Sequence, residues 1–422
     1  MNTTLKLAAG AIAVAGALAG TAHAAGFMLT EQSAGSMGRA YAGVGVDGTD
    51  ISGVYYNPAT MVLHPGTMIQ AGVVGIGLNL DYAGDNGDRE NGRLKSQAIP
   101  HGYITHQIND DMWVGLALTV PFGMGTEYAD DWSQNQRGIS ATILTFDFNP
   151  NFAWKLTERL SFGAGISVQY ESADLTIRQV VPNTNELGTV KSEIDADSWA
   201  WGWNVGLMWR PIDNLRFGVS YRSEVEHNAK GDLTISSPNS VMQGIIAQYP
   251  DLNPIGTTPG AATVSAPAWA LVSAAWDVND LLSLYASFRW ADWSSFDELK
   301  ITSNGQLKAQ IPNKWKDTYL GSLGADLRLT DWWTLRGGVA YETSPISKPQ
   351  YRTAIIPDAD RWWFAVGSSF KLLDNLQWDI SFAHLHGVHE RDLYSSAEGG
   401  DKVGRFRKLD AYLLGTQMVY RF

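Results

Sequence analysis

Residues 199–210 read WAWGWNVGLMWR, and this stretch decides the fold because large apolar residues occupy every second position. One face of the stretch carries Trp199, Trp201, Trp203, Val205, Leu207 and Trp209. The other face is small or polar apart from Met208, and it carries Ala200, Gly202, Asn204, Gly206 and Arg210. A period of two residues is typical of a β-strand with different surroundings on its two sides. One face of this strand suits lipid and the other suits a wet interior.

The same alternation recurs in residues 215–222 and 282–290, and it ends the chain over residues 412–422 with a terminal aromatic, Phe422. A soluble β-sandwich also alternates. However, its apolar face is seldom so dominated by tryptophan at strand ends, which is where membrane interfaces place aromatic side chains. The composition agrees, with 17 Trp and 16 Tyr in the chain. We therefore predict an all-β fold, a transmembrane antiparallel β-barrel.

Short polar links between alternating runs give the number of strands. They lie at residues 109–111, 157–158, 211–214, 278–280, 330–331 and 374–375. Asn, Asp and Pro, which are favoured in tight turns, dominate these links. Six short turns with both termini on the same side predict fourteen strands, with the barrel spanning residues 67–422.

The longer links should lie outside the cell, and two stand out, at residues 179–197 and 229–261. The second contains Val241, Ile245 and Ile246, which are apolar residues at roughly helical spacing. They could form a short helix whose apolar face binds an apolar ligand, or they could pack against neighbouring loops. The sequence leaves both interpretations open.

Residues 1–24 have the pattern of a signal peptide. Lys6 precedes an apolar run at residues 7–18, and Ala22-His23-Ala24 fits a cleavage site. An exported chain of this length without cysteine fits the bacterial envelope, and we predict the outer membrane as its location. The net charge of −12 disfavours nucleic acid as a partner. No nucleotide or other cofactor motif is recognised, so no cofactor is expected.

The segment that follows the signal peptide is rich in Gly, Ser and Ala and has no sustained strand or helix periodicity. Such a segment cannot build a core of its own, but it can occupy a pore. Because fourteen strands are predicted around it, we expect residues 25–66 to plug the barrel, and we call this segment the hatch.

One predicted strand is interrupted. Residues 112–120 alternate well, but Pro121, Phe122 and Gly123 follow at once. Proline removes a donor from the strand ladder, and glycine within a strand often marks a bend. An interruption inside the membrane would leave a gap in the wall. Alternatively, Pro121 lies beyond the bilayer and opens an external loop. Because a crossing strand needs about nine to eleven residues, both interpretations stay open.

Several short motifs together resemble one family. Ala25-Gly26-Phe27, Gly38-Arg39-Ala40-Tyr41 and Asn57-Pro58-Ala59 resemble the hatch of the long-chain fatty-acid transporters of the outer membrane, the FadL family. The resemblance continues, in the same order, through residues 201–204 (WGWN), 221–225 (YRSEV), 315–319 (WKDTY), 356–361 (IPDADR) and 386–387 (HG). It covers essentially the whole mature chain.

The resemblance implies a route for the ligand. Hydrophobic compounds would be captured in a groove between the two long loops, pass to a lumenal site and leave sideways where a strand kinks inward. The kink of the family matches Phe122 and Gly123 in this chain. By the same resemblance, Lys316 and Arg178 would lie near a ligand carboxylate, and Phe27 would contribute to the apolar wall.

Other groups of residues carry weaker hypotheses. His384, His386 and His389 suggest a metal site, but no thiolate is available and no carboxylate is clearly spaced as a third ligand, so none is predicted. Residues 357–361 are interpreted as a rim loop braced by Asp and Arg rather than as a cation site. No serine has a recognisable nucleophile context, so the protein is not expected to be an enzyme.

Together these features predict passive outer-membrane transport of hydrophobic compounds, above all long-chain fatty acids, by a protein that works as a monomer among outer-membrane lipids. One alternative is a general diffusion porin for small polar solutes, which would need an open lumen without a plug. The other alternative is an uptake channel of the same family for aromatic hydrocarbons.

Overall fold

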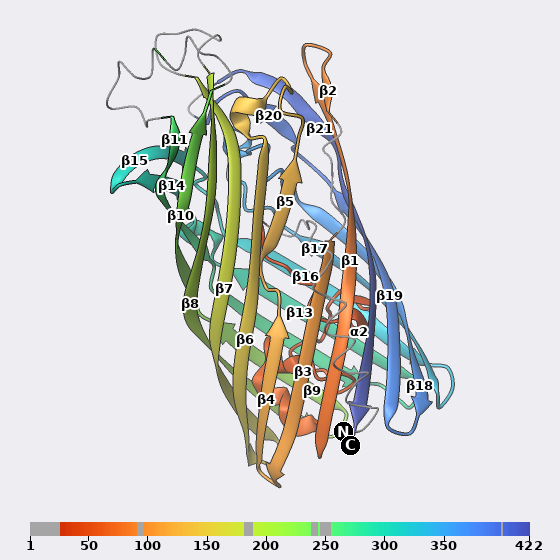
Figure 1. Ribbon diagram of the computed structural model, residues 1–422. Helices are drawn as coiled ribbons and strands as arrows, with labels where there is room; N and C mark the ends of the chain where they lie inside the picture. The colour runs from red at the N-terminus through yellow and green to blue at the C-terminus, as the bar shows by residue number, and fades with distance from the viewer. Residues whose placement is uncertain (1–25, 91–96, 181–188, 238–243, 245–254, 398–399) are drawn as a thin grey trace.

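The computed structural model describes residues 26–90, 97–180, 189–237, 244, 255–397 and 400–422 (Figure 1). The predicted signal peptide, residues 1–24, lies outside the described residues. The predicted groove residues Val241, Ile245 and Ile246 lie outside them as well. Among the described residues, no helix is both long enough and apolar enough to cross a membrane.

A closed antiparallel β-barrel forms the wall, and its described part contains fourteen strands. Some are split into two segments, and in chain order they are β1 (Thr67–Gly84), β3 (Gln97–Asn109), β4 (Met112–Thr119) with β5 (Gly123–Glu127), β6 (Ser140–Thr157), β7 (Leu160–Val180), β8 (Thr189–Ile212), β9 (Leu215–Arg222) with β10 (Val225–Ser236), β11 (Gly256–Ala266) with β12 (Trp269–Asp277), β13 (Leu282–Ala291) with β14 (Glu298–Ser303), β15 (Gln306–Pro312) with β16 (Thr318–Arg328), β17 (Trp333–Glu342), β18 (Arg361–Leu373), β19 (Leu376–Gly387) and β21 (Lys402–Arg421). The last strand, β21, pairs with β1 and closes the barrel.

Small elements complete the described structure. They are the short strands β2 (Arg89–Glu90) and β20 (Asp392–Tyr394), the helices α2 (Ala34–Met37) and α3 (Gly53–Tyr56), and the 3₁₀ turns η2 (Pro58–Leu63), η3 (Asn135–Arg137), η5 (Trp293–Ser295) and η6 (Pro349–Tyr351). The first two helices and η2 belong to the hatch.

The sequence pattern of β8 is borne out by its exposure. Trp199 and Trp201 face outward and are 70% and 73% exposed, whereas Gly202 and Asn204, which follow them in the strand, are buried in the interior. All six predicted short turns join consecutive strands. These turns share one end of the barrel with the C-terminus, so the opposite end carries the longer connections (Figure 1). The predicted strand number is therefore confirmed.

The two long loops are shorter than predicted. Strand β7 continues to Val180 and β8 starts at Thr189, with a regular ladder from Ser172↔Asp197 to Val180↔Thr189. In the other predicted loop, 229–261, β10 extends to residue 236 and β11 starts at residue 256. The loops predicted at 179–197 and 229–261 thus contain the outer ends of paired strands.

An inversion of polarity explains this error. In the outer part of β8, Val190, Ile194 and Ala196 are buried on the inner side, whereas Lys191 and Asp195 point outward. Strand ends that extend beyond the lipid meet water on the outside, so their outer face is polar and their inner face packs. A search for strands with an apolar outer face therefore misses these strand ends.

The hatch lies inside the barrel, where α2 is visible behind the front strands in Figure 1. Its side chains are almost completely buried from residue 26 to residue 61. Its backbone is hydrogen-bonded to inward-facing side chains from several strands: Ala34 N donates to Gln417, Gly43 N to Ser287 and Gly45 N to Ser273, while Ser220 and Ser161 donate to the carbonyls of Tyr56 and Ala59. The wall thus supplies the partners that the hatch cannot supply itself.

Candidate functional site

The first described residues of the hatch lie at the centre of an aromatic cluster. Phe27 is fully buried, and its ring centroid lies 4.7 Å from that of Trp293 and 5.6 Å from that of Phe296. Phe122 and Trp315 complete the cluster, with centroids at 6.0 and 6.1 Å. The contacts of Phe27 with Trp293, Phe296 and Phe122 are edge-to-face, and contacts of this kind add stability beyond the area they bury. The cluster joins the hatch to the predicted kink, to the segment between β13 and β14, and to the segment between β15 and β16.

Gly26 lets the hatch reach this cluster. Its φ is +63°, and an added Cβ atom would lie 2.6 Å from Trp315 and 2.8 Å from Trp293. The Gly26 N–H donates a hydrogen bond of 2.7 Å to Asp358 Oδ2. A side chain at position 26 would therefore separate the hatch from both the tryptophans and the loop carboxylate.

Asp358 also confirms the braced rim loop that the sequence predicted for residues 357–361. Its carboxylate accepts from the Arg361 guanidinium, and Arg352 Nε donates to its main-chain carbonyl at 3.0 Å. Burial raises the pKa of Asp358 to about 6, although Arg361 and the Gly26 N–H both oppose that change.

The interrupted strand is held by the hatch. Strand β4 ends at Thr119 and β5 begins at Gly123, and Figure 1 shows the two following one another in the wall. Between them, Pro121 O accepts from Leu29 N at 2.8 Å, and Gly123 N donates to Phe27 O at 2.9 Å. On the side that would face β3, this backbone pairs with the hatch instead of with a strand, while its other side stays paired with β6.

Gln32 completes the pairing with its side chain. Gln32 Nε2 donates to Val120 O at 2.7 Å, and Gln32 Oε1 accepts from Val120 N at 3.2 Å. A side-chain amide offers one donor and one acceptor side, so it satisfies both groups of a single strand residue. The interruption therefore leaves Val120 without an unpaired backbone group.

A gap in the wall ladder follows from this arrangement. The pairing of β3 with β4 stops at Gly102↔Leu118, and β5 pairs with β6 on its other side. In the described part of the chain, no ladder joins β5 to β3. Phe146 of β6, next to the Thr145 that hydrogen-bonds Phe122, faces outward and is 48% exposed. The gap thus lies beside an apolar outer surface, and Pro121 leads into a further wall strand rather than into an external loop.

The Asn57-Pro58-Ala59 motif is where the hatch rests on the wall. Asn57 Nδ2 donates to Gly45 O at 2.8 Å and to Leu207 O at 3.0 Å, and its Oδ1 accepts from Ala59 N. A Cβ atom at Gly206 of β8 would lie 2.0 Å from Asn57 Oδ1. At Gly163 of β7, it would lie 2.4 Å from Ala59 N. The motif therefore occupies a seat that exists because these wall positions lack side chains.

Charged residues hold the centre of the hatch. Arg39 is fully buried, pairs with Asp47 of the hatch and reaches Asp326 of β16 at 3.1 Å. Its guanidinium also lies 4.0 Å from the centre of the Tyr285 ring. Breaking one side of such a buried pair leaves an uncompensated charge, so the network fixes the position of the hatch in the lumen.

The two predicted carboxylate partners lie in different surroundings. Lys316 is exposed, next to the buried Trp315, and its N–H donates to Pro345 O at 2.8 Å. Arg178 lies on the outer face of β7, opposite the buried Leu175 and Ile177. It donates to Thr189 Oγ1 and to the main-chain oxygen of Asp130. The structure therefore corrects the predicted lumenal placement of Arg178.

Arg289 was missed as a site residue, since the sequence marks it only as one of several inward charges. It lies in a pocket with apolar walls that include Met28, Leu29 and Trp269. Arg289 Nη1 donates to Thr30 Oγ1 at 2.9 Å, and Nη2 pairs with Glu342 at 2.8 Å. Its place on the inner face of residues 282–290 was readable, but its contact with the hatch depends on long-range packing.

The chain is similar to known outer-membrane proteins over nearly its whole length. It is 29% identical over 441 residues to the long-chain fatty acid transport protein of Escherichia coli O6:H1, with 98% of each chain covered. It is 30% identical over 434 residues to the 47 kDa outer membrane protein of Pasteurella multocida, with 99% of this chain and 98% of that protein covered.

Solved structures share the fold. A FadL homologue of Pseudomonas aeruginosa is 25% identical, with a TM-score of 0.87 over 94% of this chain and 100% of that one. The toluene transporter TodX of Pseudomonas putida is 17% identical, with a TM-score of 0.69 over 89% of this chain and 94% of that one. A family model described as outer membrane protein transport protein (OMPP1/FadL/TodX) matches residues 15–422. Because this match covers nearly the whole sequence, the chain belongs to the OMPP1/FadL/TodX family of outer-membrane transport proteins.

Proposed function

We propose that this outer-membrane transporter carries long-chain fatty acids as a single chain, passively, with the hatch as its gate. The observation that supports this most directly is the pairing of hatch residues 27–32 with the strand interruption at residues 120–123, beside the aromatic cluster. A relative that is similar over 98% of the chain is named a long-chain fatty acid transport protein. Its ligand class fits a site that combines aromatic walls with a nearby exposed cation.

The cluster suits an acyl chain, and its edge suits a carboxylate. Phe27, Trp293 and Trp315 offer apolar surface from which water is excluded. Lys316 adjoins Trp315 in the chain but stays in contact with solvent. A fatty acid placed between them would bury its tail and keep its charge hydrated, which avoids the cost of burying an unpaired carboxylate. This proposal retains Lys316 as the partner of the ligand carboxylate and leaves out Arg178.

Occupation of the cluster would be coupled to opening of the wall. A tail that displaces Phe27 would also pull on Met28 and Leu29, which pair with Phe122 and Pro121. Releasing this pairing would uncover the gap between β3 and β5. The ligand would then leave sideways into the lipid, driven by its concentration gradient.

Straightening the kink tests the exit route. In the double variant Pro121→Val with Gly123→Val, the strand regains a donor at position 121 and gains bulk at position 123. An added Cβ at Gly123 would already lie 2.9 Å from Leu29 Cδ1. We expect fatty-acid uptake into proteoliposomes to fall severalfold, while the barrel stays heat-stable on gels. Uptake equal to that of the parent protein would remove the lateral exit from the proposal.

Replacing Lys316 tests the ligand class. Lys316→Ala should weaken binding of a fatty acid more than binding of the matching fatty alcohol, because only the carboxylate of the acid can form an ion pair with the lysine. An equal loss for both would exclude Lys316 as the carboxylate partner. Toluene uptake that exceeds oleate uptake would favour the aromatic-hydrocarbon alternative, and rapid liposome swelling in small sugars would favour the porin.

A further inference from the structure

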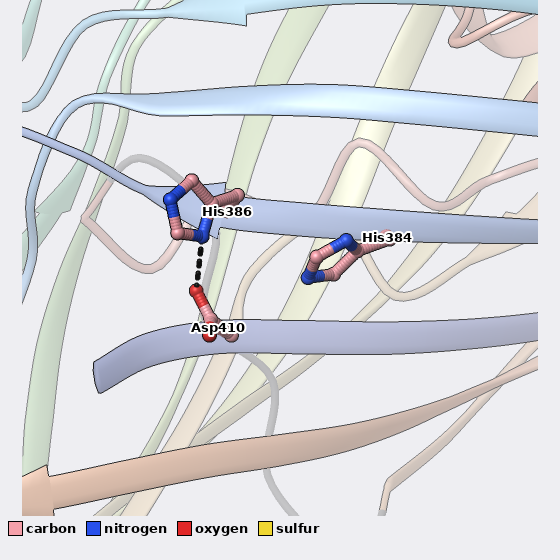
Figure 2. A group of neighbouring side chains, drawn as sticks. All are labelled: His384, His386 and Asp410. Atoms are coloured by element: carbon pink, nitrogen blue, oxygen red, sulfur yellow. Dashed lines mark hydrogen bonds and ion pairs between the residues drawn. The ribbon is translucent and has the colours of Figure 1, made fainter.

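A second group of residues with binding chemistry lies on the outer surface, away from the hatch. His384 and His386 are two residues apart on β19 and share its outward face. The register of β19 against β21 places Asp410 directly opposite His386, and Tyr412 directly opposite His384. Cross-strand neighbours on one face are close enough for their side chains to meet. Figure 2 shows the two imidazoles and the carboxylate gathered on this face.

The three side chains offer their ligand atoms to a common point. One nitrogen from each histidine and one oxygen of Asp410 all lie within 4.8 Å of one another. His386 Nδ1 is 2.9 Å from Asp410 Oδ1, the contact drawn dashed in Figure 2. His384 Nε2 is buried and has no hydrogen-bond partner among the described residues. A polar atom buried without a partner is costly, so this nitrogen calls for a partner of its own.

The sequence pattern had argued against a metal ion because no carboxylate was clearly spaced as a third ligand. The fold supplies that ligand from a strand more than twenty residues further along the chain, since His386 and Asp410 are 24 positions apart. From these contacts we propose that His384, His386 and Asp410 bind a divalent transition-metal ion, with zinc as the best fit, near the outer end of β19 and beside the middle of β21.

The donor set selects the kind of ion. Two imidazoles and one carboxylate are a common ligand set for zinc, whereas calcium and magnesium prefer oxygen ligands alone. Tetrahedral zinc bonds of about 2.0–2.1 Å place ligand atoms about 3.3 Å apart. The pair at 2.9 Å would have to open slightly, and His384 would have to approach by at most about 1.5 Å. His386 is half-exposed, so a fourth position stays open to solvent or to a lipid headgroup.

Neighbouring groups already orient the ligands. The His384 ring stacks on Tyr412 with centroids 4.7 Å apart and an interplanar angle of 8°. The Gly387 N–H donates to Asp410 Oδ1 at 3.3 Å. Such supporting contacts fix ligand orientation in metal sites and thereby raise affinity. An ion at this point would tie β19 to β21 close to Gly387, where β19 ends.

Metal binding to the purified full-length barrel in detergent tests the proposal. After equilibrium dialysis against micromolar zinc, we expect one ion per chain by mass spectrometry. Cobalt(II) should give the intense visible absorption of a tetrahedral site. His384→Gln and Asp410→Asn should each weaken zinc binding by about 100-fold. Mutating the residues that only support metal ligands already lowers metal affinity by about 10–100-fold, and these two substitutions remove the ligands themselves. Zinc should raise the melting temperature of the parent protein and should not raise that of the two variants.

His389 provides the matched control. Its Nδ1 lies 3.0 Å from Asp360 Oδ2, so it forms a similar exposed pair, but with Tyr341 as the third group. His389→Gln should bind zinc as the parent does. Unchanged zinc affinity in His384→Gln, or an equal loss in His389→Gln, would overturn the proposal. Should a variant fail to fold, the cobalt spectrum of the parent protein decides, because an octahedral, weakly absorbing spectrum would also overturn it.

Discussion

At the scale of single residues, the side chain of Gln32 replaces a neighbouring strand as the hydrogen-bond partner of Val120. Its side-chain amide pairs with both backbone groups of Val120, where the wall ladder has been interrupted. In the variant Gln32→Met, the shape is kept but both hydrogen bonds to Val120 are lost, together with the one that Gln32 Nε2 donates to Leu29 O. The two backbone groups of Val120 would then lack partners, at a cost of about 1–3 kcal/mol each. We expect faster amide hydrogen exchange in peptides covering residues 112–123, measured by mass spectrometry.

The control for this experiment is Gln310, an exposed glutamine whose amide contacts only the side chain of Glu298 among the contacts described. Gln310→Met should leave exchange near the kink unchanged. If Gln32→Met exchanges at the parent rate over residues 112–123, the side chain does not hold the interruption.

The sequence located some site residues and not others, for identifiable reasons. The kink residues Pro121 and Gly123 were found because backbone chemistry at a proline or glycine is local. Lys316 and Arg178 came from short motif matches, which carry no information about which way a side chain points. Arg178 belongs to the part of β7 where the two faces exchange polarity, so its outward direction was not readable. Arg289 needed the contact between the hatch and β13, which no local pattern contains.

At the scale of elements, the seat of the hatch depends on two wall glycines. A methyl group at Gly206 would overlap the amide oxygen of Asn57, which is held in place by hydrogen bonds to Gly45 and Leu207. Gly206→Ala should therefore displace the Asn57-Pro58-Ala59 turn, with an overpacking cost of about 1–3 kcal/mol. We expect a lower melting temperature and a severalfold increase in liposome swelling with small sugars, because a displaced hatch leaves the lumen less well filled.

Gly321→Ala is the matched control, because an added Cβ at Gly321 of β16 would meet no heavy atom within 4 Å. Liposomes that contain this variant should swell at the parent rate, and its melting temperature should equal that of the parent protein. Equal swelling rates for the Gly206 and Gly321 variants would show that the turn tolerates the extra methyl group and that the seat of the hatch does not limit the leakage of small sugars.

The strands also show where a periodic pattern succeeds. Inside the membrane each strand meets lipid on one side, so the apolar face of β8 points outward and the alternation is strong. Beyond the membrane, Val190 and Ile194 turn their apolar side chains inward while Lys191 faces water. The alternation with a period of two residues persists, but the apolar side chains now point inward and the polar ones outward. A sequence reading that required an apolar outer face ended these strands too early and made the loops too long.

At the scale of the whole molecule, the barrel and hatch form one closed unit. The strand number followed from six short turns, which depend only on local chemistry, and so the wall was predictable. The path of the hatch was not, because its partners are spread over many strands and include buried charges such as Arg39 with Asp326. A lumen filled by buried hatch residues does not suit a general diffusion porin, which would need an open constriction.

The attachment of the hatch to the rim should respond to pH. The Gly26 N–H donates to Asp358, whose charged neighbours are Arg361 and Glu342 and whose pKa is raised from 3.8 to about 6 by burial. Because the folded pKa lies above the unfolded value, the charged carboxylate is the form that folding disfavours. This penalty is present above about pH 6 and is relieved as the pH falls through 6. Acid therefore adds a little stability at Asp358 while it weakens the charge-assisted bond to Gly26.

Between pH 7.5 and pH 5, one measurement should therefore report a weaker hatch tether and another a slightly more stable fold. Amide exchange of peptides that start at residue 26, corrected for the intrinsic pH dependence, should become severalfold faster as the tether weakens. The contribution of Asp358 to the melting temperature should rise slightly. In Asp358→Asn, a neutral side chain of the same shape accepts at both pH values, so neither change should occur. If the corrected exchange rate of the parent protein is the same at both pH values, protonation of Asp358 does not release the hatch, and the gate must respond to the ligand alone.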